Sequence, residues 1–550
     1  MTEEAATSAH TRKGQIITFY SYKGGVGRSM AAANIATVFA QRGHRVLLWD
    51  MDLEAPGLHR YMLNPDTKLG ARRYWPQTRQ RGSIDLFEKL HNELITLGQT
   101  ASPALTQEAV GEAIATIIGK LLDDPQYQYR VRLMNPSSPI LSAELSFIAA
   151  GQLQADYSQQ VLDFDWVALY DIDARIFPLL REELLKRYDY VVIDSRTGIS
   201  DVGSICTALL PDKLVLAFLT NQQSLQGALQ MGRQALARRA QMEPSGPLEV
   251  FPLLSRVDFG EDELRQRWVR KAQHDFARLL PQTESGTTAN LDLYFDSIIC
   301  PHNSYYAYDE QIAAERERST SAGTLAAAYS HLADSLDCAT LLEAQKQLAK
   351  PQLDRLDAEL QATQVGEVSN LSLLVRKMQF LTRFGEYQAI NAVFEMFQNS
   401  YSNYKPDSFS NLRQKKNDRD VLEQLYECAA YIKINCLLEL KEYEELLKVA
   451  APYESRWMDD AGIAGSLPVT FDLQFNRAIA LLKTKAVAQA LQLAVALEDW
   501  AQQSTDPGIR SFLTATRRFQ VRSLQGLGRK AEAEAISAQL AAETPPETFY

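Results

Sequence analysis

A glycine-rich segment near the N-terminus, KGGVGRS at residues 23–29, has the composition of a phosphate-binding loop. It follows an apolar run at residues 16–20, typical of a buried strand, and precedes a helix-favouring stretch at residues 30–41. Glycines let backbone N–H groups turn toward an anion, and a helix N-terminus adds about half a positive charge. A serine at the end of such a loop supplies a hydroxyl to Mg²⁺. The segment therefore predicts a site for a phosphate-bearing ligand and a divalent cation, with Ser29 facing the cation.

The strict phosphate-loop pattern, G-x-x-x-x-G-K-[ST], fails at two positions of this segment. Tyr22 stands where the first glycine belongs, and Arg28 replaces the usual lysine. Arginine keeps the charge but is longer and planar, so the replacement is not neutral. We expect this replacement to affect the rate at which a bound phosphate-bearing ligand is hydrolysed more than the binding of that ligand.

Carboxylates follow two further apolar runs. Asp50 and Asp52 come directly after residues 45–49, and Asp194 comes directly after residues 190–193. In an open α/β sheet the carboxyl ends of the strands face the ligand crevice. In a continuing strand Asp50 and Asp52 share one face, whereas a turn separates them, so the sequence leaves the division of roles between them open.

Taken together, these motifs resemble the deviant Walker A loop, KGGxGK[ST], of the MinD/ParA class of P-loop ATPases, over roughly residues 14–310. The arginine is similar to that of the KGGVGR branch of bacterial multidomain proteins, some tied to conflict and signalling systems. The resemblance implies ATP and Mg²⁺ as ligands, with Lys23 reaching the partner subunit's nucleotide across a sandwich dimer. It implies that Arg28 touches the β- and γ-phosphates and that Ser29 holds Mg²⁺. The residues that it places around the phosphates are Gly24, Gly25, Val26 and Gly27.

The same resemblance assigns roles to the carboxylates. Asp50 becomes a partner of Mg²⁺-bound water, Asp52 orients the attacking water, and Asp194 ends a Walker B strand and binds Mg²⁺ through water. Glu54 is a second candidate beside Asp52, and a helix or turn cap is an equally good reading of it. Residues 195–198, SRTG, stand where the class usually has D-x-P-P-G and are a candidate γ-phosphate-sensing switch.

The segment SRVD at residues 255–258 lies where related nucleotide-binding proteins carry a base-recognition element. Its match to N-K-x-D is poor, so guanine specificity is not supported and ATP is the default ligand. Pro301 and the aromatic stretch at residues 302–308 are candidates for flanking the adenine ring, and core packing is the alternative.

Composition excludes several classes of protein. The 57 Lys and Arg residues against 68 Asp and Glu residues give a net charge of −11, which argues against a protein that coats DNA. The five cysteines are scattered without a C-x-x-C pair, so a disulfide framework and a structural zinc site are not expected. The sequence shows no apolar stretch long enough for a membrane span and starts without a signal peptide. We therefore expect a cytoplasmic protein that does not use a membrane.

Strand-like and helix-like stretches alternate in the first part of the chain. The apolar runs are residues 16–20, 45–49, 145–149, 190–193, 213–219 and 249–254. Such alternation predicts a mostly parallel, doubly wound α/β sheet. Residues 61–143 loosen into an expected helical insertion, with helices at residues 83–97 and 107–122.

From about residue 320 the chain is typical of paired helices. Four polar turns, centred on residues 384–387, 440–443, 483–485 and 527–530, join helix-favouring stretches at roughly 43- to 56-residue intervals. They resemble degenerate tetratricopeptide repeats, in which an L-G-x-Y-like turn closes each hairpin; an irregular helical bundle is the alternative. Either arrangement offers a groove or face to another protein.

These observations predict a flexible tail at residues 1–13, an ATPase domain at 14–319, a helical linker at 320–365 and an all-α repeat domain at 366–550. The main hypothesis is a slow ATPase switch that forms a nucleotide-dependent homodimer and whose helical repeats relay its state to a protein partner, in a bacterial signalling or defence system. Nucleic acid is not expected as a partner. The alternatives are a non-catalytic nucleotide-binding scaffold and a ParA-like DNA-associated partitioning ATPase. For the latter a modest basic cluster is present, for which a solvated helix face is the more common reading: Arg233, Arg238, Arg239, Arg265, Arg267, Arg270 and Lys271.

Overall fold

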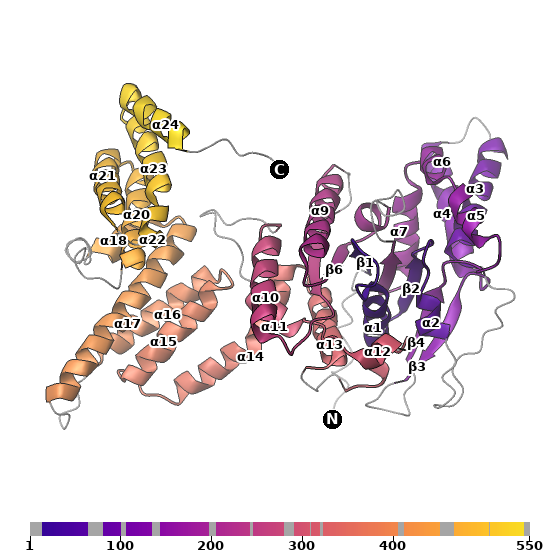
Figure 1. The fold of residues 1–550 in the computed structure, drawn as a ribbon, viewed down its shortest axis with the longest axis horizontal. Helices are drawn as coiled ribbons and strands as arrows, with labels where there is room; N and C mark the ends of the chain where they lie inside the picture. The colour runs from indigo at the N-terminus through magenta and orange to yellow at the C-terminus, as the bar shows by residue number, and fades with distance from the viewer. Residues whose placement is uncertain are drawn as a thin grey trace. The chain divides into compact units, whose positions relative to one another are not determined.

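The computed structural model describes residues 14–63, 81–100, 106–134, 143–196, 205–241, 246–279, 291–308, 310–318, 323–404, 412–451, 467–504 and 507–543. Contacts divide the chain at Leu348 into two compact units, an α/β unit before that residue and a helical unit after it (Figure 1). The predicted tail at residues 1–13 and the predicted boundary near residue 320 lie outside the described residues.

The first unit is built on a seven-stranded sheet with the order β3-β4-β2-β5-β1-β6-β7. All neighbours pair in parallel except β3 and β4, which pair antiparallel at one edge. The strands are β1 (Gln15–Ser21), β2 (Val46–Met51), β3 (Tyr129–Leu133), β4 (Ala143–Ile148), β5 (Tyr190–Ser195), β6 (Lys213–Phe218) and β7 (Glu249–Leu254). The predicted mostly parallel α/β sheet is thereby confirmed.

Helices cover both faces of this sheet (Figure 1). They are α1 (Arg28–Gln41), α2 (Leu58–Leu63), α3 (Ser83–Thr100), α4 (Gln107–Asp123), α5 (Tyr157–Asp163), α6 (Trp166–Ile172), α7 (Ile176–Arg187), the π-helix η2 (Ile205–Leu209), α9 (Gln222–Arg239), α10 (Asp262–Ala277), α11 (Asp292–Ser297), α12 (Ser304–Tyr308), the 3₁₀ turn η3 (Ala313–Glu315) and α13 (Leu325–Asp337). None of the helices described here or below combines the length and the apolar character that a membrane span needs.

The strands are apolar on both sides because two cores sandwich the sheet. In β2, Leu48 joins the core beneath α1 and α13, whereas Leu47 and Trp49 join the opposite core beneath α3, α4 and α7. β5 alternates in the same way, with Val192 on the first side and Val191 on the second. Successive side chains of a strand point to opposite faces, so only a sheet covered on both faces accommodates an unbroken apolar run.

The region expected to be a helical insertion also contains a strand. Helices α3 and α4 lie where helices are predicted, and β3 follows them as the antiparallel edge strand. Along β3 the burial alternates, with Val131 buried and Arg130 and Arg132 exposed. A short strand with one solvated face lacks the continuous apolar signal of the central strands, which is why the sequence does not reveal it.

The second unit is helical throughout its described residues. Its helices are α14 (Leu341–Gln361), which begins in the first unit, α15 (Val368–Thr382), α16 (Tyr387–Ser402), α17 (Leu412–Glu439), α18 (Tyr443–Ala450), α20 (Leu467–Lys483), α21 (Val487–Gln503), α22 (Pro507–Ser511), α23 (Leu513–Gly526) and α24 (Lys530–Glu543). Small apolar clusters join one helix pair to the next: one cluster combines α17, α18 and α20, and another combines α20, α21 and α23.

One turn geometry closes four helix pairs of this unit: α15/α16, α17/α18, α20/α21 and α23/α24. Each pair has one residue with a left-handed backbone in its turn, at Gly385, Lys441, Lys485 and Gly528, with φ between 61° and 75°. The residue after it donates its N–H to the carbonyl five positions back, as Ala486 does to Leu481 at 2.8 Å. This is the Schellman motif, which satisfies helix-terminal carbonyls. These turns lie where the sequence predicts them, and the further likeness to tetratricopeptide repeats stays a prediction.

Lys485, one of the two lysines with a left-handed backbone, allows a matched test of this geometry. Lys485→Gly is expected to stabilise the helical unit by up to about 1 kcal/mol, because glycine adopts φ 67° without a Cβ penalty. Lys483→Gly, at the end of α20, is expected to destabilise it by up to about 1 kcal/mol, because glycine is costly in a helix. Thermal unfolding of the full chain, followed by circular dichroism, compares the two variants. Equal destabilisation by both would refute this interpretation of the turn.

Candidate functional site

The loop between β1 and α1 presents backbone rather than side chains. Gly24 and Gly25 are exposed, and Gly25 and Gly27 have φ of 73° and 94°, which favour glycine. Helix α1 has no acidic residue in its first turn, and Gly27 caps it without a side chain. Its first N–H groups and the positive end of its dipole are therefore open to an anion.

Tyr22, the residue that breaks the strict phosphate-loop pattern, packs against helix α9. Its ring occupies the space that a Cβ of residue 227 would need, so the glycine there makes room for it. This packing gives Tyr22 a structural role in placing the loop.

Arg28, the first residue of α1, is turned inward and forms ion pairs with two carboxylates. Its Nε donates to Asp194 and its Nη2 donates to Asp52. The arginine side chain is 7% exposed, and those of Asp52 and Asp194 are 7% and 0% exposed. Burial alone would lower the pKa of Arg28, but the charges of Asp194 and Asp52 outweigh it and raise the pKa above its usual value. Arg28 is therefore a permanent cation at the end of β5.

Asp50 and Asp194 lie side by side on adjacent strands. The register of β2 and β5 pairs them directly, and both are completely buried. Asp50 accepts from the N–H of Asp52 at 3.1 Å and from that of Leu58 at 3.3 Å. Burial, followed by the charges of Asp194 and Asp52, raises the pKa of Asp50 well above its usual value. Burial also raises the pKa of Asp194, although Arg28 opposes the rise.

The site has the features that a magnesium ion needs. Ser29 places its hydroxyl beside Asp194 and favours the charged form of that carboxyl. Asp194 Oδ2 is buried and, among the described residues, has no hydrogen-bond partner. No ready-made cluster of three His, Cys, Asp or Glu ligands occurs in the described parts of the chain. Mg²⁺ is usually held by one or two carboxylates together with substrate phosphates, so Ser29, Asp50 and Asp194 fit such an ion.

Two other predicted residues lie near the loop without joining this cluster. Lys23 is partly exposed, and its carbonyl accepts from Ser21 Oγ at 2.8 Å. Glu54 forms an ion pair with Arg196 at 2.7 Å on the surface, and both readings of Glu54 stay predictions. Of the predicted switch at residues 195–198, Thr197 and Gly198 lie outside the described residues.

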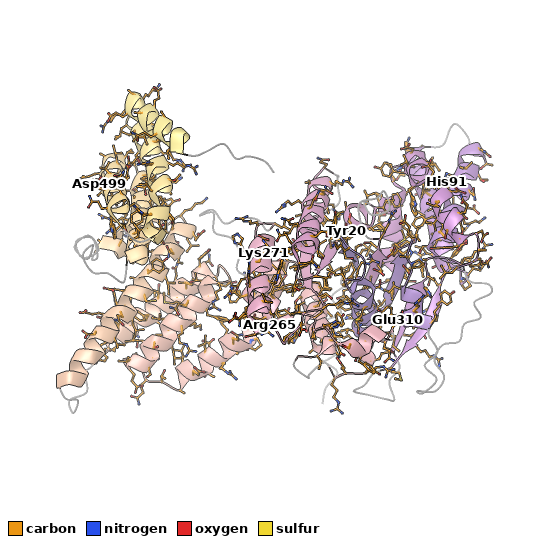
Figure 2. All side chains as sticks on the ribbon, in the orientation of Figure 1. Tyr20, His91, Arg265, Lys271, Glu310 and Asp499 are labelled. Atoms are coloured by element: carbon orange, nitrogen blue, oxygen red, sulfur yellow. The ribbon has the colours of Figure 1, made fainter. Side chains whose placement is uncertain are left out.

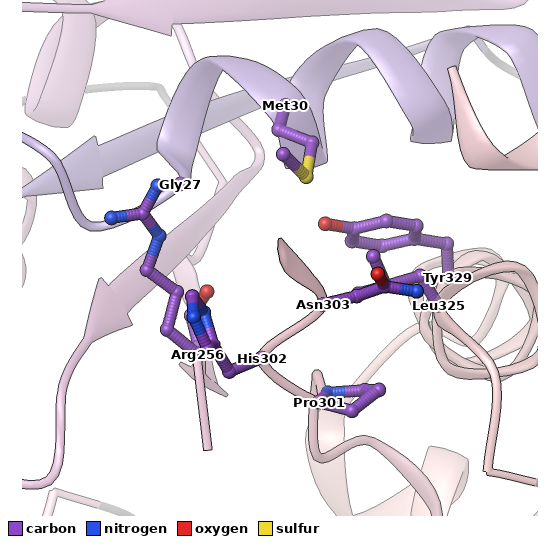
Figure 3. A pocket seen from close by; sticks show the side chains of 9 residues that line it. Gly27, Met30, Arg256, Pro301, His302, Asn303, Leu325 and Tyr329 are labelled. Atoms are coloured by element: carbon purple, nitrogen blue, oxygen red, sulfur yellow. The ribbon is translucent and has the colours of Figure 1, made fainter. Parts of the chain in front are cut away.

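A small cleft opens beside the N-terminus of α1 (Figure 3). It is lined by Gly27, Met30, Ser255, Arg256, Pro301, His302, Asn303, Leu325 and Tyr329. The segment after β7 is tied to residues 300–302, because Val257 donates to the Cys300 carbonyl at 3.0 Å and His302 donates to Val257 at 2.8 Å. The two segments predicted to flank a nucleotide base thus line one cleft.

Three residues of this cleft are not apparent from the sequence. Met30 comes from the first turn of α1, and Leu325 and Tyr329 come from α13, far along the chain. In the sequence, Leu325 and Tyr329 belong to an alanine-rich apolar stretch that indicates only a helix. No spacing or residue type links them to the glycine loop.

One family model and several solved structures are similar to this chain. Residues 17–451, more than half of the chain, match the family model described as the CobQ/CobB/MinD/ParA nucleotide binding domain. No curated protein matches the sequence. Among solved structures, ParA of pNOB8 bound to nonspecific DNA is 14% identical, with a TM-score of 0.34, and the alignment covers 63% of this chain and 99% of that one.

Two further solved structures show similar values. The cell division ATPase MinD of Pyrococcus furiosus is 17% identical, with a TM-score of 0.31 and coverage of 59% and 98%. Cobyrinic acid a,c-diamide synthase of Mycobacterium smegmatis, with bound ADP and magnesium, is 15% identical, with a TM-score of 0.32 and coverage of 59% and 94%. The DNA, ADP and magnesium named above were bound to those proteins.

The buried Arg28 ion pairs predict a large effect on stability. Arg28→Ala leaves Asp52 and Asp194 buried without their counter-charge, which should cost about 3–5 kcal/mol of unfolding free energy. The control is Arg45→Ala, which removes an exposed arginine–aspartate pair with Asp189 and should cost less than about 1 kcal/mol. Denaturant unfolding of both variants provides the comparison. A loss at Arg28 no greater than that at Arg45 would contradict the described geometry.

Proposed function

The chain belongs to the CobQ/CobB/MinD/ParA nucleotide-binding family, and we propose that it is an ATP-dependent molecular switch that hydrolyses ATP slowly. The observation that carries the proposal is the position of Arg28. The single buried cation at the start of α1 lies between a glycine loop that exposes backbone N–H groups and carboxylates from two strands. Such a residue can exchange one set of anions for another.

Arg28 is proposed to change partners when nucleotide binds. In the structure it neutralises Asp52 and Asp194. Phosphates bound at the glycine loop compete for the guanidinium, which suits phosphate oxygens as well as carboxylates. Its departure frees Asp194 for the ion that accompanies ATP, with Ser29 beside it. Bound Mg²⁺ would supply charge neutralisation at the β- and γ-phosphates.

Slow hydrolysis follows from the same exchange. Asp52 is the candidate for orienting the attacking water, and Arg28 holds its Oδ2. Asp52 becomes available as a hydrogen-bond acceptor for water when that ion pair opens. Breaking a buried ion pair is costly unless both charges find new partners, so turnover depends on complete assembly of the site.

ATP is the proposed nucleotide because the cleft beside Gly27 lies next to the glycine loop and combines apolar with polar side chains. Its walls combine apolar side chains, Met30 and Leu325, with polar groups at Ser255 and His302. Binding sites for small molecules commonly pair a mostly apolar lining with a few polar groups that fix orientation. The phosphates would then lie at the glycine loop, adjacent to the cleft through Gly27, which borders both.

Lys23 is proposed to link nucleotide binding to dimerisation, and the helical unit is proposed to bind a protein partner. Lys23 is partly exposed at the mouth of the loop, where it can reach a phosphate in a second copy of the chain. A twofold arrangement satisfies both lysines at once. The helical unit presents repeated hairpins to a protein partner, as in tetratricopeptide-like repeats, and a bacterial signalling or defence system is the proposed context.

DNA binding is a second candidate function, because α9 and α10 expose arginines. Arg233, Arg267 and Arg270 are exposed. Other basic residues of the cluster are engaged: Arg239 donates to backbone carbonyls, and Arg265 and Lys271 on α10 pair with Asp262 and Asp275 (Figure 2). The expectation that nucleic acid is not a partner is therefore left open. A static nucleotide-binding scaffold is the third candidate.

Two kinds of variant distinguish the residues proposed to contact Mg²⁺ from the residue proposed to orient the attacking water. Ser29→Ala and Asp194→Asn are expected to weaken Mg²⁺-dependent ATP binding in calorimetry, because each removes a contact to the shell of the ion. Asp52→Asn should retain binding yet lose most turnover, whereas Glu54→Gln, which breaks only a surface ion pair, should retain both. Wild-type affinity in both metal-site variants would overturn the site. If only Glu54→Gln loses ATP turnover, the water-orienting role belongs to Glu54. If the wild type shows no ATP turnover, the static nucleotide-binding scaffold is favoured.

Dimerisation is tested through Lys23. Lys23→Ala should keep most of the ATP affinity but lose ATP-induced association in light scattering, because its partner is a phosphate of the second subunit. Lys120→Ala, an exposed lysine on α4, is the matched control and should associate normally. A wild type that stays monomeric with a non-hydrolysable ATP analogue would refute the dimer. Repeating the measurement with added DNA tests the second candidate, which requires binding that falls steeply with salt.

A further inference from the structure

Helix α13 lines the same cleft as the first turn of α1, the helix that follows the glycine loop. Leu325 and Tyr329, in the first two turns of α13, face the cleft together with Gly27 and Met30 (Figure 3). Tyr329 is almost completely buried, its hydroxyl points toward the cleft in Figure 3, and it interacts with Cys300. A base seated there would touch α13 directly.

The opposite end of α13 is anchored at the amino edge of the sheet. Lys213, the first residue of β6, donates from Nζ to the carbonyls of Leu336 and Cys338 at 2.5 Å each, and to Gln15 at 2.8 Å. Tyr190 of β5 donates to Asp337. A helix of 13 residues is about 20 Å long, so α13 runs from the cleft to the far edge of the sheet.

Between its ends α13 is attached to α1. Arg42, which follows α1, forms an ion pair with Asp334 at 2.8 Å and donates to the Ser330 carbonyl at 3.3 Å. On the approach to α13, the N–H of Ala314 donates to Asn34 at 2.9 Å. The helix that starts at the phosphate loop and the helix that lines the cleft therefore pack as one layer on the sheet (Figure 1).

Helix α14 begins at Leu341, shortly after α13 ends, and continues beyond Leu348 into the helical unit. α13 is thus the last helix that lies wholly in the α/β unit, and α14 follows it along the chain.

We propose that the base of a bound nucleotide acts on α13 through Leu325 and Tyr329, and that α13 and α14 carry the state of the site to the helical unit. This inference rests on the proposed nucleotide-binding function and specifies its route. In this proposal Leu325 and Tyr329 are positioning residues that contact the base, whereas the glycine loop contacts the phosphates. Nucleotide binding should therefore have two separable effects, one on the loop and one on α13 and α14.

Hydrogen exchange on the full chain separates these effects by using two probes with Mg²⁺. A non-hydrolysable ATP analogue carries both base and phosphates, and tripolyphosphate carries only the phosphates. At about 100 times Kd, linkage allows exchange to slow by up to about 100-fold in segments stabilised by the ligand. The analogue is expected to slow exchange in residues 22–41, in α13 and in α14. Tripolyphosphate is expected to slow it in residues 22–41 alone.

The other outcomes overturn the inference in distinguishable ways. Protection of residues 22–41 by the analogue without protection of α13 and α14 refutes the route but leaves the proposed function standing. Equal protection of α13 and α14 by tripolyphosphate refutes the role of the base. If neither probe protects any segment, the nucleotide-binding function itself fails.

A pair of variants on one helix tests the two residue positions. Leu325→Ala removes a side chain that lines the cleft, whereas Leu332→Ala makes the same change two turns later, at a buried position outside the cleft. Both lower stability, but only Leu325→Ala is expected to lose the protection of α14 by the analogue while keeping that of residues 22–41. If Leu332→Ala abolishes protection of α14 as Leu325→Ala does, the cleft contact is not the route.

Discussion

The arrangement of the site depends on one buried ion-pair cluster, in which Arg28 bridges Asp52 and Asp194. The three residues come from the start of α1, the end of β2 and the end of β5, so the cluster forms only when these elements have their native register. A buried guanidinium and buried carboxylates are each costly alone and acceptable together. The same cost makes the cluster sensitive to any new anion or cation that reaches it.

Charge in the cluster is unbalanced. Three carboxylates, those of Asp50, Asp52 and Asp194, gather around a single guanidinium, and burial with mutual repulsion raises the pKa of Asp50 and of Asp194. A second cation would relieve that repulsion, and a phosphate chain would compensate for the loss of Arg28 from the carboxylates. In the proposed switch, Mg²⁺ and a polyphosphate would therefore bind together more favourably than either alone. That coupling is what a nucleotide switch requires.

Sequence patterns predict the central part of this architecture because its signals are local. The glycine loop, the apolar runs of the parallel strands and the carboxylates at their ends are each contiguous, and the turns at Gly385, Lys441, Lys485 and Gly528 are contiguous as well. The edge strand β3 escapes prediction because two of its five residues are exposed to solvent. The contribution of Leu325 and Tyr329 to the cleft escapes it because packing of distant segments has no signature in a single sequence. The inward turn of Arg28 onto Asp52 likewise depends on tertiary geometry, whereas Lys23 as a residue acting across a dimer stays a prediction.

A structure determined with Mg²⁺ and a non-hydrolysable ATP analogue tests the exchange of Arg28 between anions most directly. We expect the phosphates at residues 23–29, the base in the cleft lined by Ser255 and His302, and Arg28 turned from Asp194 toward the phosphates, with the ion between Ser29 and Asp194. Arg28 still paired with both Asp52 and Asp194 while the analogue is fully bound would contradict the switch.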